Sequence, residues 1–113
     1  MNVGDIYSVE LPPRGGHAQT GRRPAIILQT AEISAKIPTV LAVPLTSQQG
    51  ATRFPATILI TPDAENRLRA GSVALVFQLA AIDKRFVTTK IGKVSDKILR
   101  EIIEHLNKIT GQK

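Results

Sequence analysis

Two short polar motifs in this 113-residue chain carry groups that suit phosphate chemistry. Residues 22–24 (RRP) lie between a glycine-rich loop and an apolar run, and residues 46–48 (TSQ) follow the next apolar run. An arginine guanidinium is a fixed positive fork that matches phosphate oxygens, and a threonine hydroxyl can donate to the same phosphate. Such donors can stabilise the extra negative charge of a phosphorane, so the two motifs are candidate positions for chemistry.

Motifs that would indicate a metal or a nucleotide cofactor are absent. The sequence has no GxxxxGKS/T loop, no GxGxxG after a strand, no HExxH and no cysteine. Its two histidines, His17 and His105, are far apart in the chain, and His105 is expected on a helix surface. We therefore expect no metal and no cofactor. His17 lies in the glycine-rich loop, close in sequence to Arg22 and Arg23, and is the one group there with an ordinary pKa close to neutral. It is a candidate for proton transfer, although a plain solvated loop histidine explains it as well.

The net charge suits a polyanionic partner. The formal charge is +6 and the isoelectric point is about 10.2, as in many nucleic-acid-binding proteins, although a merely basic surface explains the charge equally well. The basic residues form two clusters: Arg14, His17, Arg22 and Arg23, and then Lys84, Arg85, Lys90, Lys93 and Lys97.

The elements that must position these groups are short strands followed by one helix. Strands are predicted at residues 5–11, 24–30, 39–46, 55–60 and 72–79, with a weaker edge strand at 85–92. Pro44 predicts that its end of the third strand is an edge or a bulge, because proline lacks the N–H that a central strand donates. Thr61 and Pro62 predict a short helix, and a longer amphipathic helix starts at Ser95 and ends at Gly111. The order predicts a mainly β fold, a small curved antiparallel sheet or barrel with a C-terminal helix.

Length and composition predict a single domain over residues 1–113. With 42% hydrophobic residues the chain should fold, and the absence of cysteine fits a reducing cytoplasm. No signal peptide or apolar run long enough to cross a membrane is recognisable, so we expect a cytoplasmic protein without membrane contact.

The ordered series of motifs resembles the MazF/PemK family of toxin ribonucleases. The matching pieces are Gly4-Asp5-Ile6-Tyr7, Leu11-Pro12-Pro13-Arg14-Gly15-Gly16, Gly21-Arg22-Arg23-Pro24-Ala25, Pro44-Leu45-Thr46-Ser47, Ser72-Val73-Ala74-Leu75 with Gln78, and Ile82-Asp83-Lys84-Arg85. The resemblance implies an SH3-like barrel that forms a homodimer and cuts single-stranded mRNA at short sequence motifs, without metal or ribosome. It also implies inhibition by a MazE-like antitoxin whose acidic tail occupies the RNA groove.

The same resemblance assigns roles to single residues. Arg23 and Thr46 correspond to the catalytic arginine and threonine of the family, and Gln78 to a glutamine that meets RNA. From the residues themselves, Phe54 is the first candidate for base stacking, and the remaining candidates for RNA contact are Arg14, Arg22, Ser47, Gln48, Arg53, Lys84 and Arg85. A satisfied amide at Gln78 and a purely solubilising role for the surface cations are equally open.

One position departs from the family pattern. Ala18 stands in the loop where many members carry a glutamate with a base or positioning role. The glutamate can be dispensable in this branch, His17 or water can take the proton instead, or the alanine can be an inactivating change. Two other functions therefore stay open beside the ribonuclease: an RNA-binding variant with impaired catalysis, and a gyrase-binding toxin that resembles CcdB.

Overall fold

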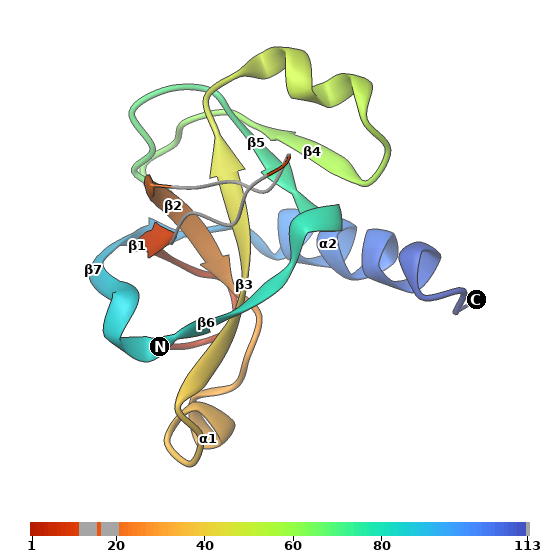
Figure 1. Cartoon of the computed structure of the whole chain (residues 1–113). Coiled ribbons are helices and arrows are strands. Elements are labelled where there is room, and N and C mark those ends of the chain that lie inside the picture. Colours follow the sequence, from red (N-terminus) through yellow and green to blue (C-terminus); the bar gives the residue numbers. More distant parts are fainter. Residues whose placement is uncertain (12–15, 17–20, 113) are drawn as a thin grey trace.

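The computed structural model describes residues 1–11, 16 and 21–112, and within them seven strands of one antiparallel sheet precede the C-terminal helix (Figure 1). The sheet order is β4-β5-β3-β2-β1-β7, and β6 also pairs with β3. The strands are β1 (Asp5–Leu11), β2 (Gly21–Ile27), β3 (Thr39–Thr46), β4 (Thr57–Ile60), β5 (Ser72–Leu75), β6 (Ala80–Asp83) and β7 (Val87–Lys93). This confirms the predicted mainly β fold with a C-terminal helix.

The strand β3 is the centre of the sheet. It pairs with β2 along one side, and along the other with β6 from Thr39 to Ala42 and with β5 from Leu45 to Thr46. Pro44 therefore lies opposite Ala25 in a buried central strand, and its prediction as an edge or bulge position is wrong. Proline is tolerated there because it falls between the segments paired with β6 and β5, where no ladder hydrogen bond needs its missing N–H.

The curved sheet buries apolar side chains on both faces. One core cluster contains Val43 and Leu45 of β3 together with Ile102 of the C-terminal helix. The other contains Val40 and Ala42 of β3, packed among residues of β1, β2 and β6. Since neighbouring residues of a strand point to opposite faces, the nearly unbroken apolar run of β3 is what two buried faces require.

The C-terminal helix, α2 (Asp96–Ile109), forms as its sequence predicts. The Ser95 hydroxyl accepts a hydrogen bond from the Ile98 N–H at 3.2 Å and caps the first turn. Gly111, with φ of +76°, follows the last turn in the left-handed conformation that glycine adopts without strain. No helix in the described part of the chain has the length and apolar character needed to span a membrane.

The segment between β4 and β5 is a hydrogen-bonded turn, and the short helix predicted from Thr61 and Pro62 is wrong. The Asp63 carboxylate accepts from the backbone N–H groups of Glu65 and Asn66, at 2.9 and 2.7 Å. The buried Asn66 amide oxygen accepts from the N–H groups of Asp63 and Leu68, both at 3.0 Å. These side chains satisfy the backbone groups that a helix would otherwise pair.

Four further differences from the sequence prediction are local. A one-turn helix, α1 (Ala31–Ser34), precedes β3, and the 3-10 turn η1 (Gln49–Arg53) replaces part of the expected polar loop. The strand predicted over residues 72–79 ends at Leu75 and continues as the 3-10 turn η2 (Val76–Gln78). The turn η3 (Lys84–Phe86) then leads into β7. Each of these elements is too short to give a period that a sequence pattern could show.

Replacing Asn66 by alanine should destabilise the fold. The side chain is 2% exposed and its amide nitrogen also donates to the Thr61 carbonyl oxygen at 2.9 Å, so the substitution leaves buried backbone groups unpaired. We expect Asn66→Ala to lower the free energy of unfolding by about 1–3 kcal/mol in a denaturant titration. The control is Asn107→Ala, at an exposed position of α2, where no loss is expected. Equal losses in the two variants would contradict this account of the turn.

Candidate active site

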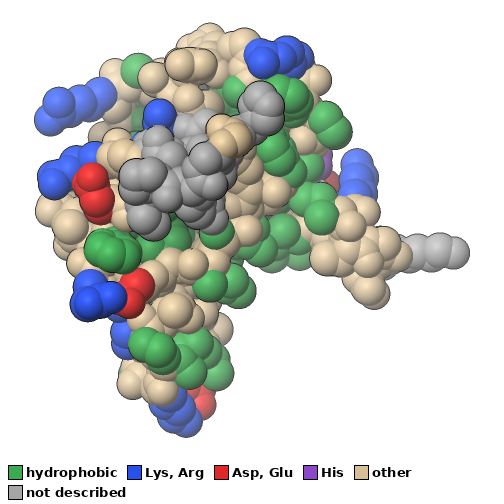
Figure 2. Space-filling view, in the orientation of Figure 1, with side chains coloured by type: hydrophobic (Ala, Val, Ile, Leu, Met, Phe, Trp, Pro, Cys, Tyr) green, Lys and Arg blue, Asp and Glu red, His purple; other side chains and the backbone are tan. Residues whose placement is uncertain are grey.

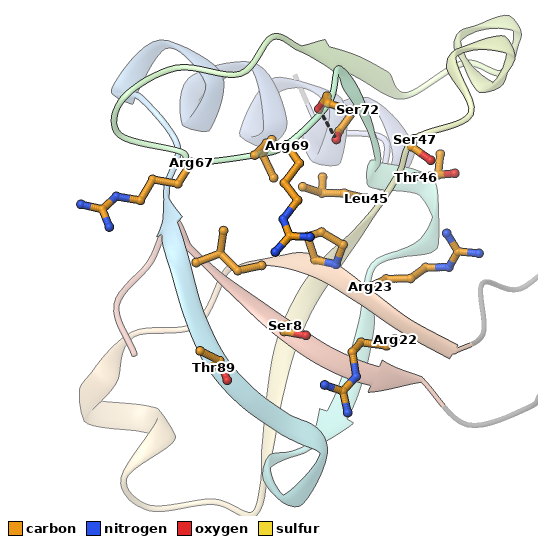
Figure 3. Close-up of a pocket in the computed structure, with 14 residues that line it drawn as sticks. Ser8, Arg22, Arg23, Leu45, Thr46, Ser47, Arg67, Arg69, Ser72 and Thr89 are labelled. Atoms are coloured by element: carbon orange, nitrogen blue, oxygen red, sulfur yellow. Dashed lines mark hydrogen bonds between the residues drawn. The ribbon is translucent and has the colours of Figure 1, made fainter.

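The residues predicted to act on phosphate, Arg23 and Thr46, line one cavity of about 640 Å³ (Figure 3). Its walls come from β1, β2, β7, the end of β3 and the turn between β4 and β5. Besides Arg23 and Thr46, the lining residues are Ser8, Arg22, Pro24, Leu45, Ser47, Arg67, Leu68, Arg69, Ala70, Ser72, Thr89 and Ile91.

Thr46 is the last residue of β3 and is held there by pairing on β5. It lies opposite Val73 in the ladder and is 5% exposed. Its hydroxyl oxygen accepts a hydrogen bond from the backbone N–H of Gln48 at 3.2 Å. A hydroxyl has one donor and two acceptor sites, so the Thr46 hydrogen can still be donated to a bound group. The hydroxyl is thus oriented before any ligand arrives.

Arg23 reaches the same cavity from β2. It is half-buried and lies opposite Val9 of β1 in the ladder. Figure 3 shows its side chain extending toward the side of the cavity where Thr46 and Ser47 lie. Its neighbour Arg22 is exposed and forms an ion pair with Glu10, at 3.5 Å between Arg22 Nε and Glu10 Oε2. The pairing of β1 with β2 therefore fixes the backbone positions from which both arginine side chains extend.

Two arginines that the sequence prediction did not include also line this cavity. Arg67 and Arg69 are exposed and flank the buried Leu68 in the turn between β4 and β5. The alternation of basic and apolar residues in RLR was the available signal, but the segment was interpreted as the continuation of a short helix. Four arginines and no described carboxylate now line the cavity, which makes it a site for anions.

Ser47 lines the cavity and Gln48 lies exposed beside it, but other predicted contact residues lie elsewhere. Arg53 covers the ring of Phe54 at 4.4 Å from its centroid, and the Phe54 and Phe77 rings are 5.6 Å apart. The half-buried Gln78 follows Phe77 in η2, and its side chain or backbone has a partner within the fold.

Phe54 belongs to a second, apolar cavity of about 550 Å³, lined also by Pro55, Ala56, Phe77, His105, Lys108 and Ile109. Figure 2 shows hydrophobic side chains gathered on this face beside the C-terminal helix. Phe54, Phe77 and Ile109 are 43%, 42% and 49% exposed, so this cavity presents three large apolar side chains to solvent. His105, expected at a plain helix surface, lines this cavity.

Lys84 and Arg85 line neither cavity. The ammonium group of Lys84 donates to the Ser34 carbonyl oxygen. Arg85 donates through Nε and Nη2 to the two carboxylate oxygens of Asp83, at 3.1 and 3.0 Å. Hydrogen bonds from the Arg85 side chain, and then from its backbone, lower the pKa of Asp83. In the described structure both cations are thus engaged by groups near η3 and α1.

The remaining predicted positions, Arg14, His17 and Ala18, lie outside the described residues. Among the residues that the structure describes, no three His, Asp or Glu side chains gather in a way that could hold a metal ion. The described cavity offers fixed hydrogen-bond donors and positive charge that suit a phosphate group.

The sequence is similar to one protein family and to two bacterial endoribonucleases. The sequence matches, over residues 2–110, the family described as the PemK-like, MazF-like toxin of type II toxin–antitoxin systems. It is 30% identical over 102 residues to endoribonuclease MazF of Staphylococcus saprophyticus, which covers 90% of this chain and 84% of that protein. It is 26% identical over 106 residues to endoribonuclease MazF6 of Mycobacterium tuberculosis, covering 93% and 92% of the two chains.

Two solved structures are similar over nearly the whole chain. MazF of Deinococcus radiodurans superposes with a TM-score of 0.85 and 23% identity, covering 99% of this chain and 97% of that one. MazF in a MazE–MazF crystal from the same organism gives a TM-score of 0.76 and 24% identity, covering 100% and 97%. At these identities the likeness establishes the fold.

Proposed function

The chain belongs to the PemK-like, MazF-like toxin family of type II toxin–antitoxin systems, and from this premise we propose that it is a metal-independent endoribonuclease that cuts single-stranded mRNA. The relatives that match its sequence over most of their length are named endoribonucleases. The observation that carries the proposal is that Arg23 and the buried Thr46, whose hydroxyl is oriented by the Gln48 N–H, line the same basic cavity.

RNA carries its own nucleophile, and this explains why so few groups are needed. The 2′-oxygen attacks the adjacent phosphorus, the bond to the 5′-oxygen breaks, and the products are a 2′,3′-cyclic phosphate and a free 5′-hydroxyl. One proton leaves the 2′-hydroxyl and one is given to the 5′-oxygen. Arg23 neutralises the charge on the non-bridging oxygens and assists the leaving oxygen, while Thr46 donates to the same phosphate.

The group that accepts the 2′-hydroxyl proton is the open part of this mechanism. No carboxylate is among the described residues that line the cavity, and Ala18 replaces the glutamate typical of the loop. Arginine is a poor base at neutral pH because of its high pKa. His17 or a water molecule can take the proton, and His17 has the more suitable ordinary pKa.

The family also gives the partners and the setting. Relatives have been solved with antitoxins, among them a MazE–MazF complex, which supports a MazE-like antitoxin as the partner of this toxin. The basic cavity suits the acidic antitoxin tail that the family resemblance implies. The proposed toxin is a homodimer and works on mRNA in the cytoplasm. The two other functions left open by the sequence, a gyrase-binding toxin and an RNA-binding variant without catalysis, are not favoured by relatives named endoribonucleases.

The first prediction concerns the two donors. Purified protein in EDTA should cut a long single-stranded RNA into discrete fragments that end in 2′,3′-cyclic phosphate. Arg23→Ala and Thr46→Val should each lower kcat by about 10²–10³-fold, the range seen when one donor to a developing oxyanion is deleted. Thr46→Ser keeps the hydroxyl and should retain most of the activity.

Two results would contradict the proposal. The first is RNA left intact by a folded protein at every concentration tested, with binding lost on Arg23→Ala, which would favour an RNA-binding variant. The second is cleavage that stops in EDTA and returns with added Mg²⁺, which would show a metal-dependent reaction.

The second prediction concerns the base. If His17 accepts the proton, kcat/KM of the parent protein rises with pH through a pKa near the ordinary histidine value of about 6.5. The His17→Ala variant should lose this rise of kcat/KM with pH. Adding Ala18→Glu to His17→Ala should restore a rise at lower pH, near the ordinary glutamate pKa of about 4.3. An unchanged profile in His17→Ala would remove His17 from the mechanism and leave water in that role.

The third prediction concerns base stacking at Phe54. Its ring is 43% exposed at the apolar cavity, although it also contacts Arg53 and Phe77. Phe54→Ala should weaken RNA binding by about 1–3 kcal/mol, the usual cost of losing one base–aromatic stack. Phe54→Tyr keeps the ring and should bind like the parent, whereas Phe54→Leu keeps only the bulk. Equal RNA affinity in the leucine variant and the parent would show that the ring does not stack on a base.

A further inference from the structure

The turn between β4 and β5 brings Arg67 and Arg69 to the wall of the cavity that holds Arg23 and Thr46. Resting on the proposed ribonuclease function, we propose that these two arginines bind RNA phosphates beside the scissile one. They would fix the path and affinity of the substrate without reading its bases. Their distinction from Arg23 is that they act on neighbouring phosphates and not on the reacting group.

The backbone that carries this arginine pair is held rigidly. The side-chain oxygens of Asp63 and Asn66 accept hydrogen bonds from backbone N–H groups and close the turn, and the Arg67 N–H donates to the Asp63 carbonyl oxygen at 3.1 Å. Leu68, between the two arginines, is buried in the same core cluster as Ile102 of α2. A turn fixed on both sides of each arginine lets the guanidinium groups be positioned with little loss of backbone entropy on binding.

The turn is also fastened to β7. Lys93 donates its N–H to the Glu65 carbonyl oxygen at 3.1 Å. A Cβ on Gly92 would lie 2.5 Å from the carbonyl oxygen of Asn66, so the approach of β7 to the turn requires glycine at this position. The wall that carries the arginine pair is therefore continuous with the strand that lines the floor of the cavity through Thr89 and Ile91.

Arg67 adopts an uncommon conformation for its residue type. Its φ is +54°, in the left-handed region that few non-glycine residues occupy. The turn could be closed at this position by glycine at no steric cost, yet the chain carries a long cationic side chain. Uncommon backbone conformations of this kind cluster at ligand-binding sites, and the conformation of Arg67 therefore supports a binding role.

Both guanidinium groups are available to a ligand. Within the described residues, no acceptor or carboxylate pairs with the guanidinium group of Arg67 or Arg69, whereas the side chains of Arg22 and Lys93 form ion pairs with Glu10 and Glu65. Figure 3 shows Arg69 pointing into the cavity and Arg67 extending outward from its rim, while Arg23 lies across the opening from them. A single strand whose scissile phosphate meets Arg23 and Thr46 would thus present a neighbouring phosphate to Arg69 and a further one to Arg67.

The test measures binding of an RNA that contains 2′-deoxyribose at the cleavage site and so cannot be cut. Each phosphate contact to a single strand contributes about 0.7 to the slope of log affinity against log salt concentration. Arg69→Ala should reduce this slope by about 0.7, and the double variant Arg67→Gly/Arg69→Ala by about 1.4. Glycine is used at position 67 because it accepts the positive φ, so the turn should keep its conformation.

The matched control is Arg100→Ala, which removes the same charge from an exposed position of α2 that does not line the cavity, and should leave the slope unchanged. The RNA is also shortened nucleotide by nucleotide. Shortening from one end should abolish the difference in salt slope between the double variant and the parent, because it removes the phosphates that the two arginines bind. Shortening from the other end should leave that difference unchanged. The cleavage positions on a cuttable RNA should stay the same, since phosphate contacts carry no sequence information.

The proposal is overturned if the double variant gives the slope of Arg100→Ala, or if its effect survives shortening from both ends. Binding to polyglutamate, a probe for an acidic protein segment, is measured on the same variants. If the double variant loses polyglutamate binding but keeps the parent slope for RNA, the proposal is also overturned and the two arginines are assigned to an acidic protein partner. These outcomes are separable from a failure of the proposed function, because in that case the parent protein would leave RNA uncut whatever residue stood at positions 67 and 69.

Discussion

The pairing of β3 with three other strands is the constraint on which the rest of the molecule depends. This strand contributes side chains to both apolar clusters, and its last residue is Thr46. A shift of one residue would move each set of β3 side chains to the opposite face, where it does not fit the neighbouring cluster, so close packing on both faces specifies the register. The same burial that stabilises the sheet therefore fixes the Thr46 hydroxyl, and the antiparallel partner β2 brings Arg23 to the same end of the sheet.

The cavity combines rigid walls with a concentration of positive charge. Arg22 and Arg23 come from a hairpin, and Arg67 and Arg69 from a turn closed by buried hydrogen bonds. Placing like charges around one opening disfavours the free protein and favours a bound polyanion, which is the behaviour expected of an RNA groove and of a site blocked by an acidic antitoxin segment. The strands that form the core thus also carry the cavity, but apolar side chains stabilise the fold whereas the arginines provide the charge for binding.

Sequence reasoning predicted the parts of this molecule that follow from regular patterns. The alternation in β1, the apolar run of β3 and the helical period of α2 all formed, and Arg23 and Thr46 meet in one cavity. Pro44 and the segment after Thr61 were interpreted wrongly, because their outcome depends on which strand pairs where and on side chains that cap a turn. Arg67 and Arg69 were missed for the same reason, since only the tertiary packing of the turn against β7 brings these two residues to the wall of the cavity.

The central claim is that Arg23 and Thr46 act directly on the scissile phosphate. A crystal structure of the protein with an RNA carrying 2′-deoxyribose at the cleavage site tests this most directly. The account predicts that the non-bridging oxygens of that phosphate lie within hydrogen-bond distance of the Arg23 guanidinium and the Thr46 hydroxyl. A complex in which the scissile phosphate is held by other groups, with Arg23 and Thr46 contacting neither it nor the leaving oxygen, would contradict the account.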